Sequence, residues 1–426
     1  MDSDEKVDIL GELMSRDEGP RRFVANCFLL LSPEELKACR LVSTTWAGFI
    51  LKDLWKSSWG RRELTEKLVT RWKTVNPMTV ELNWRMQNVS SIFSTDAHVF
   101  CGFYQHGKIA VYDLSTGLLF KELTPDKRRP NYIPCTQLAG GDGIVAAAMW
   151  ETVVTVWSTH PDEMKQLHCF EVLNLHCPDP TCKHRVVNHD AITVVNRHKV
   201  AFLLAHSDWS KYSMVVLEMV GDGWVNKTLT CFSSQSHPRL KLASDSDWLA
   251  LLDNSNKKLR LWDGDNISSP EVVLPECDEG SVEDMSVDFP HLIVFFHKHG
   301  DALIKVFKMG DSVPSLVKTI LFKRNTCVGV TAMANKTIIG FRAYSLPKDV
   351  SQIILFDKRD LYDRRISPEE TSRRQINIRR GIREEMAAIN TTSIVFVRIE
   401  RDKQGREVKL LMRNDFWMTN NINMET

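Results

Sequence analysis

The sequence predicts a mainly β protein, a seven-bladed β-propeller preceded by a small domain of three helices. Two observations lead to this prediction. From about residue 89 onward, a pair of apolar strands joined by a short polar turn recurs seven times, at a spacing of roughly 43 to 56 residues. Before that point, the apolar residues follow a helical period instead. The main domain boundary therefore lies where one pattern gives way to the other.

The first helix is indicated by apolar residues that recur at every fourth position. Phe23, Cys27 and Leu31 form this stripe, and Val24 and Phe28 widen it. A stripe of this width is typical of a helix that buries one broad face. The proline at position 20 suits a first helical turn, because its missing N–H has no partner there in any case.

Capping residues then signal a second helix. Ser32, Pro33 and Glu35 occupy the N-cap, first and third positions of a capping box. The apolar residues of this helix and of a third, shorter one follow: Leu36, Cys39, Val42, Trp46, Phe49, Ile50, Leu54, Trp55 and Trp59. Three short helices cannot bury so many large side chains on their own, so we expect a partner surface. The alternative is a helical cap that packs on the propeller and needs no partner.

The seven strand pairs define the blades. They are His98 to Leu114, Ile144 to Trp157, Val200 to Met219, Trp248 to Asp263, His291 to Phe307, Thr337 to Asp357 and Ser393 to Leu411. A short inner strand precedes each pair, as at Val89 to Phe93, and an outer strand follows it, as at Leu118 to Leu123. Seven four-stranded units favour a propeller, because radial repetition leaves only short, protected sheet edges.

The ring must also be closed, and two segments are candidates for the closing strand. Thr79 to Trp84 could complete the seventh blade from the N-terminal side, and Phe416 to Met418 competes with it. The predicted domains are therefore an acidic tail (1–17), the helical domain (18–62), a linker with the candidate closing strand (63–88), the propeller (89–420) and a C-terminal tail (421–426).

Composition excludes several function classes. The 55 basic and 54 acidic residues give a net charge of +1, so there is no global electrostatic argument for nucleic-acid binding. The apolar runs are too short for a bilayer, and no apolar stretch follows the acidic segment Met1 to Asp8. The 10 cysteines are scattered without a dense framework. We therefore expect a protein of the cytoplasm, the nucleus or both, with reduced thiols, no membrane contact and no nucleic-acid partner.

The helical segment GPRRFVANCFLLLSPEELKACRLVSTTWAGFILKDLW resembles an F-box, the motif that binds the Skp-type adaptor of SCF ubiquitin ligases. Two departures are visible, since Gly19 replaces the usual leucine, and Arg21 and Arg22 replace the acidic pair. The resemblance implies that adaptor-binding residues are Pro20, Phe23, Val24, Cys27, Phe28, Leu31, Leu36, Cys39, Val42, Trp46 and Trp55.

The remainder resembles the WD-repeat family weakly. Val156-Trp157 and Leu261-Trp262-Asp263 keep the signature that ends a strand, and Tyr112-Asp113 and Phe356-Asp357 are variants of it. The glycine-histidine pair that normally opens each repeat is absent, so we do not expect the regular Asp-His hydrogen-bond network. In this order, the two halves resemble F-box/WD proteins, the substrate receptors of SCF-type ligases.

Two clusters outside these motifs are candidates for binding. Basic residues concentrate in the predicted connections after blade one and between blades six and seven, where they suit an acidic or phosphorylated client: Lys127, Arg128, Arg129, Arg373, Arg374, Arg379 and Arg380. Solvated loops are the alternative, and the neighbouring glutamates favour it. A remote zinc candidate is His176, Cys177, Cys182 and His184, although a proline-rich connection explains this stretch better than a metal site does.

We find no nucleophile elbow, phosphate-binding loop, zincin pair or dinucleotide fingerprint in the sequence. The leading hypothesis is therefore a non-catalytic receptor without a cofactor, which binds the Skp-type adaptor, and through it cullin and the RING subunit, and presents a protein client. One alternative is a propeller scaffold outside any ubiquitin ligase. Another is a propeller enzyme with a metal or acid-base site in its central channel.

Overall fold

The computed structural model forms two compact units. One comprises Met1–Met78, Thr391–Ser393 and Asn414–Thr426, and the other comprises Thr79–Asn390 and Ile394–Arg413. The structure describes residues 8–15, 18–29, 31, 33–50, 54, 58–74, 77–86, 89–104, 107–125, 135–149, 152–160, 163–172, 184–187, 191–206, 209–233, 240–246, 248–253, 258–263, 266–267, 272–274, 281–298, 301–310, 314–322, 327–335, 337–345, 350–371, 373–377, 383–390, 393–401 and 407–416.

The first unit is helical. Its helices are α1 (Ile9–Ser15), α2 (Glu18–Phe28), α3 (Pro33–Cys39), α4 (Thr44–Phe49) and α5 (Ser58–Thr74). The three helices predicted between residues 18 and 62 correspond to α2, α3 and α4. None of the described helices is both long enough and apolar enough to cross a membrane.

Two boundaries of the helical part differ from the prediction. The segment expected to be an acidic tail contains α1, because Leu10, Leu13 and Met14 give it an apolar face that packs into the helical core. The boundary predicted after residue 62 falls inside α5, which continues to Thr74. In α5, Leu68, Val69 and Trp72 are buried, and the Trp72 ring packs against Phe416 with centroids 4.1 Å apart and the ring planes tilted by 30°.

The second unit consists of antiparallel sheets, seven of them among the described residues. Six of these sheets follow the chain in order and begin with their inner strand. They are β2–β5 (Val89–Ser94, His98–Phe103, Ile109–Asp113, Leu119–Leu123), β6–β9 (Cys135–Gly141, Ile144–Met149, Val153–Ser158, Gln166–Glu171), β10–β14 (Arg185–Val186, Ile192–Asn196, Lys199–Ala205, Lys211–Val220, Gly223–Ser233), β15–β19 (Leu240–Asp245, Trp248–Asp253, Lys258–Asp263, Asn266–Ile267, Val272–Val273), β20–β23 (Ser281–Asp288, His291–Lys298, Asp301–Lys308, Ser315–Phe322) and β24–β27 (Cys327–Ala334, Ile338–Ser345, Val350–Asp357, Arg373–Asn377).

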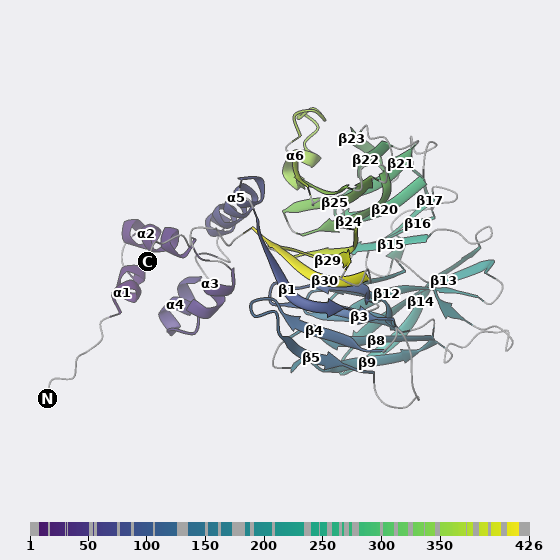
Figure 1. Ribbon diagram of the computed structural model, residues 1–426, viewed down its shortest axis with the longest axis horizontal. Helices are drawn as coiled ribbons and strands as arrows, with labels where there is room; N and C mark the ends of the chain where they lie inside the picture. The colour runs from purple at the N-terminus through teal and green to yellow at the C-terminus, as the bar shows by residue number, and fades with distance from the viewer. Residues whose placement is uncertain are drawn as a thin grey trace. The chain divides into compact units, whose positions relative to one another are not determined.

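The seventh sheet joins the two ends of the chain. Its strand order is β1 (Met78–Met86), β30 (Glu407–Asp415), β29 (Ser393–Arg401) and β28 (Arg383–Ile389). Of the two candidates for the closing strand, the one on the N-terminal side pairs with β30. Figure 1 shows this closure as dark blue β1 beside yellow β30 and β29. The architecture is therefore the seven-bladed propeller that the repeat predicts.

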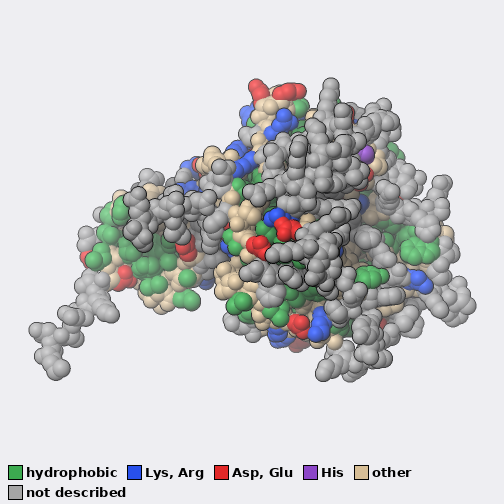
Figure 2. Space-filling view, in the orientation of Figure 1, with side chains coloured by type: hydrophobic (Ala, Val, Ile, Leu, Met, Phe, Trp, Pro, Cys, Tyr) green, Lys and Arg blue, Asp and Glu red, His purple; other side chains and the backbone are tan. Residues whose placement is uncertain are grey.

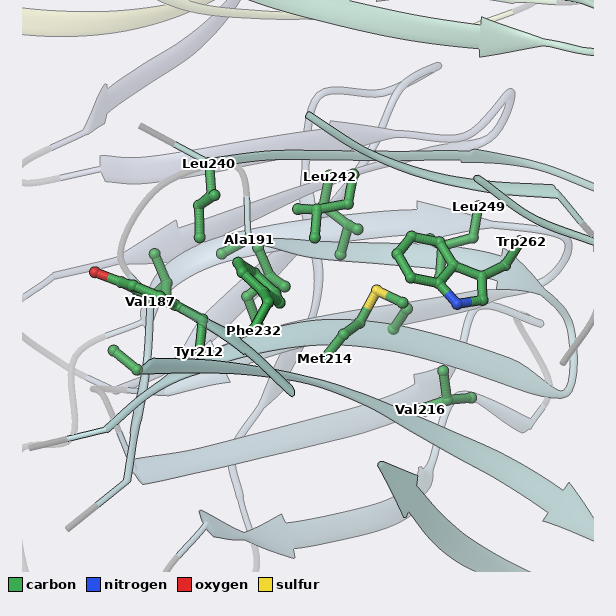
Figure 3. Packing of buried hydrophobic residues seen from close by; sticks show 14 of the residues in the cluster. Val187, Ala191, Tyr212, Met214, Val216, Phe232, Leu240, Leu242, Leu249 and Trp262 are labelled. Carbon is green, nitrogen blue, oxygen red and sulfur yellow. The ribbon is translucent and has the colours of Figure 1, made fainter. Parts of the chain in front are cut away.

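The core of the propeller lies between blades. One cluster joins the third and fourth sheets, where Tyr212, Met214 and Val216 of β13 pack towards Leu242 and Trp262. Figure 3 shows these side chains filling the space between the two sheets. Every second residue of β13 points into this layer, because side chains alternate between the two faces of a strand. Alternation thus builds one apolar layer on each side of each blade.

Polar side chains also link neighbouring inner strands. The Ser91 hydroxyl accepts a hydrogen bond from the Leu138 amide at 3.0 Å. Thr193 and Ser244 lie 2.7 Å apart through their hydroxyl oxygens. The side-chain amide of Asn390, the residue after β28 of the seventh sheet, donates to the Ser94 hydroxyl of the first sheet at 3.0 Å. Links of this kind connect blades where the regular Asp-His network is not expected.

Candidate functional site

The helical unit has an apolar core of its own, and several of the predicted adaptor-binding residues form it. Val24, Phe28 and Leu36 are buried there, and Phe28 meets Trp46 edge-on with ring centroids 5.2 Å apart. Leu31, Cys39 and Trp46 are half-buried against the same core. These six side chains therefore hold the helices together, and a partner would not contact the buried ones directly.

Two apolar side chains from the predicted set remain on the surface. Phe23 on α2 is 62% exposed, and Val42, between α3 and α4, is 61% exposed. Cys27 is exposed, Pro20 is half-buried, and Trp55 lies outside the described residues. Phe23, Val42 and the smaller Cys27 are therefore the positions of the predicted set that can contact a partner without unfolding the helices, and Phe23 and Val42 carry the larger apolar side chains.

The structure adds two exposed apolar residues that the sequence analysis did not select. They are Ile9 on α1 and Leu41 beside Val42, which are 66% and 88% exposed. Figure 2 shows hydrophobic side chains gathered over the helical unit. We call Ile9, Phe23, Leu41 and Val42 the helical apolar surface. A pair of apolar residues directly before the capping residue Ser43 is the sequence signal for the Leu41–Val42 part.

Local hydrogen bonds fix the helices that carry this surface. Ser43 is the N-cap of α4, and its side chain accepts from the Trp46 amide at 3.2 Å. The Asp8 carboxylate accepts from the Gly11 amide at 2.8 Å and from the Trp46 indole N–H at 3.2 Å. Asp8 therefore fixes the start of α1 and ties it to α4, in a segment expected to be a tail.

The predicted basic patch is only partly within the described residues. Lys127, Arg128, Arg129, Arg379 and Arg380 lie outside them. Arg373 and Arg374 were predicted to lie in a connection between blades. They lie instead on the outer strand β27, where they pair with Phe356 and Leu355 of β26. Arg373 is exposed, with its guanidinium 5.4 Å from the Phe322 ring centroid. Burial lowers the pKa of Arg374, which is half-buried.

Of the remote zinc candidates, the structure describes only His184. His176, Cys177 and Cys182 lie outside the described residues. The His184 ring is buried and meets His206 edge-on, with centroids 4.5 Å apart. Burial and the neighbouring His206 lower the pKa of His184. Within the part of the chain that the structure describes, no group of three or more His, Cys, Asp or Glu side chains is placed to hold a metal.

A cluster that the sequence analysis missed lies around α6 (Lys358–Tyr362), a helix inserted between β26 and β27. Figure 1 shows α6 and the loop after it at one edge of the propeller. Tyr362 donates a hydrogen bond to Asp288, and the Lys358 ammonium lies 2.9 Å from the same carboxylate. The His291 ring stacks on Tyr362 with centroids 4.1 Å apart. The insertion of the sixth blade is thus anchored on the fifth.

A second anchor holds the other end of this insertion. Lys318 of β23 is buried, and its ammonium donates to the Asp360 carbonyl at 2.6 Å and to the Thr371 hydroxyl at 3.2 Å. Burial lowers the pKa of Lys318, while Asp363 and Asp360 act in the opposite direction. Lys318 therefore joins both arms of the segment from α6 to β27.

Taken together, the sheets define a WD40-type seven-bladed β-propeller. Solved structures with this fold include the WD40 repeats of RRP9, at a TM-score of 0.54 and 11% identity over 80% of this chain and 99% of that one. The β-propeller domain of Cps50 (Swd1) from Myceliophthora thermophila matches at a TM-score of 0.51 and 11% identity, over 78% and 99%. The WD40 domain of SCAP from fission yeast matches at a TM-score of 0.50 and 10% identity, over 80% of this chain and 98% of that domain.

These similarities establish the fold of the propeller and nothing finer. No family model and no curated protein matches the sequence. The resemblance of the helical segment to an F-box therefore rests on the residues of that segment alone, and no comparison adds to it.

Proposed function

We propose that this chain is a non-catalytic protein-binding protein, and that it acts as a substrate receptor of an SCF-type ubiquitin ligase. In this proposal the helical unit binds a Skp-type adaptor, and through it cullin and the RING subunit, while the propeller binds the client. The observation that carries the proposal is the helical apolar surface, because Phe23 and Val42 stay exposed on a unit whose own core is already filled. Exposed apolar patches of this kind mark protein-binding sites.

Such a receptor needs no reactive side chain. A separate conjugating enzyme would perform the chemistry, and the receptor would raise the effective concentration of a client lysine near the activated ubiquitin. We propose an acidic or phosphorylated segment as the client, bound through arginines that form charge-assisted, bidentate hydrogen bonds. Arg373 is the exposed member of that set among the described residues.

The test is a pull-down of the purified chain with a Skp-type adaptor and cullin. Phe23→Asp and Val42→Asp each place a charge on the helical apolar surface without entering the helical core. The matched control is Val220→Asp, since Val220 is similarly exposed, at 60%, but ends strand β13 of the propeller. We expect binding by the wild type and the control, and at least tenfold weaker binding by the other two variants. Circular dichroism would verify that all four proteins are folded.

A second candidate function is a propeller scaffold that acts outside any ubiquitin ligase. Two observations favour it: the structural similarity is confined to the propeller fold, and Gly19, Arg21 and Arg22 depart from the F-box pattern. The same pull-down separates the two functions. If the folded wild type fails to bind the adaptor, the ligase proposal is wrong and the scaffold is the better account.

A further inference from the structure

The segment between α6 and β27 carries a sequence pattern that neither the fold nor the proposed function uses. It is Arg364-Arg365-Ile366-Ser367-Pro368, followed by two glutamates. The chain has four serines or threonines directly before a proline, Ser32, Thr124, Ser269 and Ser367. Ser367 alone among them has arginines both two and three residues before it. Two independent features of kinase substrates therefore coincide at one hydroxyl.

The structure exposes the two arginines of this pattern, whereas Ser367 is half-buried. Arg364 is exposed, and the side chain of Arg365 is 89% exposed, beside Asp363 with its guanidinium nitrogen 2.7 Å from the carboxylate. Figure 2 shows acidic and basic side chains together where this segment projects from the propeller. Kinases select substrates partly through charge patterns, and exposed arginines before the acceptor suit a groove lined by carboxylates.

Among the described residues, the hydrogen bonds that hold Ser367 are local. Its hydroxyl accepts from the Glu370 amide at 3.2 Å, and its own amide donates to the Glu370 carboxylate at 3.2 Å. Its carbonyl accepts from the amides of Glu370 and Thr371, at 3.1 and 3.0 Å. This capping box spans a single turn with two exposed glutamates, and such a small unit opens locally at a low free-energy cost. Local opening would bring the half-buried Ser367 hydroxyl within reach of a kinase. Pro368 also biases Ser367 towards the extended backbone that a substrate strand adopts.

We propose that Ser367 is a phosphorylation site for a serine kinase that accepts proline after the acceptor and selects arginine before it. In the reaction, the Ser367 hydroxyl oxygen attacks the γ-phosphorus of ATP, and the bond between that phosphorus and the β,γ-bridging oxygen breaks. ADP leaves, and the hydroxyl proton passes to the catalytic aspartate of the kinase. This proposal is independent of whether the chain belongs to a ubiquitin ligase.

The phosphoryl group would change the segment through charge. It adds about −1.5 to −2 charges at pH 7, on the oxygen that now accepts from the Glu370 amide. The Glu370 carboxylate is bound to the amide of the same serine, so the two anions repel each other. Thr371, which Lys318 holds, then loses the amide and hydroxyl contacts that it makes to the Ser367 carbonyl. Phosphorylation would therefore open the turn between Ser367 and Thr371, while Lys318 keeps its bonds to Asp360 and Thr371.

The experiment incubates the folded full chain with Mg²⁺, ATP and a panel of recombinant proline-directed and arginine-directed serine kinases, and maps phosphate by mass spectrometry. We expect incorporation at Ser367, none there in Ser367→Ala, and at least tenfold slower incorporation in the Arg364→Ala/Arg365→Ala double variant. Ser315→Ala is the control, because the Ser315 hydroxyl accepts from Arg364 at 3.1 Å but precedes a leucine. The Ser315→Ala variant should be phosphorylated at Ser367 to the same extent as the wild type.

Hydrogen exchange provides a second measurement. In the phosphorylated chain, the Glu370 and Thr371 amides should exchange about tenfold faster, which corresponds to the loss of one hydrogen bond. Absence of phosphate at Ser367 with every kinase, or labelling confined to Ser32, Thr124 or Ser269, would overturn the proposal. Equal labelling of the double arginine variant would overturn the selection by arginine.

Discussion

At the scale of single residues, Gly140 is a position where two neighbouring blades approach each other closely. A Cβ atom added at Gly140 of β6 would lie 2.2 Å from a ring carbon of Phe93 in the neighbouring blade. Only a residue without a side chain lets the two strands pack at this distance. The position is thus fixed by space, not by backbone conformation.

We predict that Gly140→Ala lowers the free energy of unfolding by about 1–3 kcal/mol, because the ring or the strand must move to make room. The measurement is chemical denaturation of both proteins. Gly223→Ala is the matched control, since no heavy atom lies within 4 Å of a Cβ added there. A cost at Gly223 equal to that at Gly140 would contradict the steric explanation.

Tyr362 is one of the residues that anchor helix α6 to the fifth blade. Its hydroxyl donates to Asp288, and burial together with that carboxylate raises its pKa far above the usual range. It therefore stays protonated and keeps donating throughout the working pH range.

Tyr362→Phe should lower the free energy of unfolding by about 1–2 kcal/mol, because the lost hydrogen bond had a charged acceptor but Lys358 still neutralises Asp288. Thermal unfolding would measure the loss. The exposed Tyr104 provides the control, and Tyr104→Phe should leave the melting temperature unchanged. A melting temperature of Tyr362→Phe equal to that of the wild type would show that the hydrogen bond adds no net stability.

At the scale of elements, the sequence predicted strands better than helices. The recurring unit of two apolar strands joined by a polar turn located the Trp248 to Asp263 pair, which the structure forms as β16 and β17 with Leu249 opposite Trp262. The sequence did not predict α6, because Asp357 was interpreted as the end of a strand signature. In the structure Asp357 also caps α6, accepting from the Arg359 amide at 3.0 Å. Because Asp357 both ends β26 and caps α6, the sequence pattern that predicted the strand end did not reveal the helix after it.

The candidate site was predictable only in part from the sequence. The apolar stripe of α2 was visible in the sequence, but which of its residues face inward depends on α1 and α4, which pack against it. Val24 is therefore buried while Phe23, one position earlier, is exposed. The cluster at α6 was not predictable, since Asp288, His291 and Tyr362 come together only through the packing of neighbouring blades.

Two strands carry histidines that link stability to pH. Burial lowers the pKa of His168 on β9, whose ring stacks on Trp224. Burial also lowers the pKa of His291 on β21, with Lys308 adding to the effect and Asp288 opposing it. Both rings are thus favoured in the neutral form when the chain is folded.

Acidification should therefore destabilise the propeller. At a pH well above 6.5, the ordinary pKa of histidine, both rings are neutral in the folded and in the unfolded chain, and the full stability is present. As pH falls below 6.5, the unfolded chain takes up protons first, so the free energy of unfolding decreases until the folded rings also titrate. Denaturation between pH 7.5 and 5 would measure the slope. The double variant His168→Gln/His291→Gln should reduce the slope without abolishing it, because His184, whose pKa is also lowered, remains. An unchanged slope would assign the pH dependence to other groups.

At the scale of the whole molecule, the stability of the ring depends on the sheet that joins its two ends. Three strands of this sheet come from the end of the sequence, and the fourth, β1, comes from before the first blade. Leu82 of β1 is buried in one core cluster with Val395, Val397 and Leu411 of the same sheet and with residues of the first blade. Glu81, beside it in sequence, is exposed, as strand alternation requires.

Leu82→Ala should lower the free energy of unfolding by about 2–5 kcal/mol, the usual cost of a cavity at a buried leucine. The effect should exceed that of local packing elsewhere, because β1 is an edge strand whose one pairing partner among the described strands is β30, and its release would leave β30 unpaired on one side. Chemical denaturation would measure the loss, and faster amide exchange along β30 would locate it. Glu81→Ala is the control and should stay within about 0.5 kcal/mol of the wild type. A loss for Leu82→Ala without faster exchange in β30 would mean that the leucine contributes packing but does not close the ring.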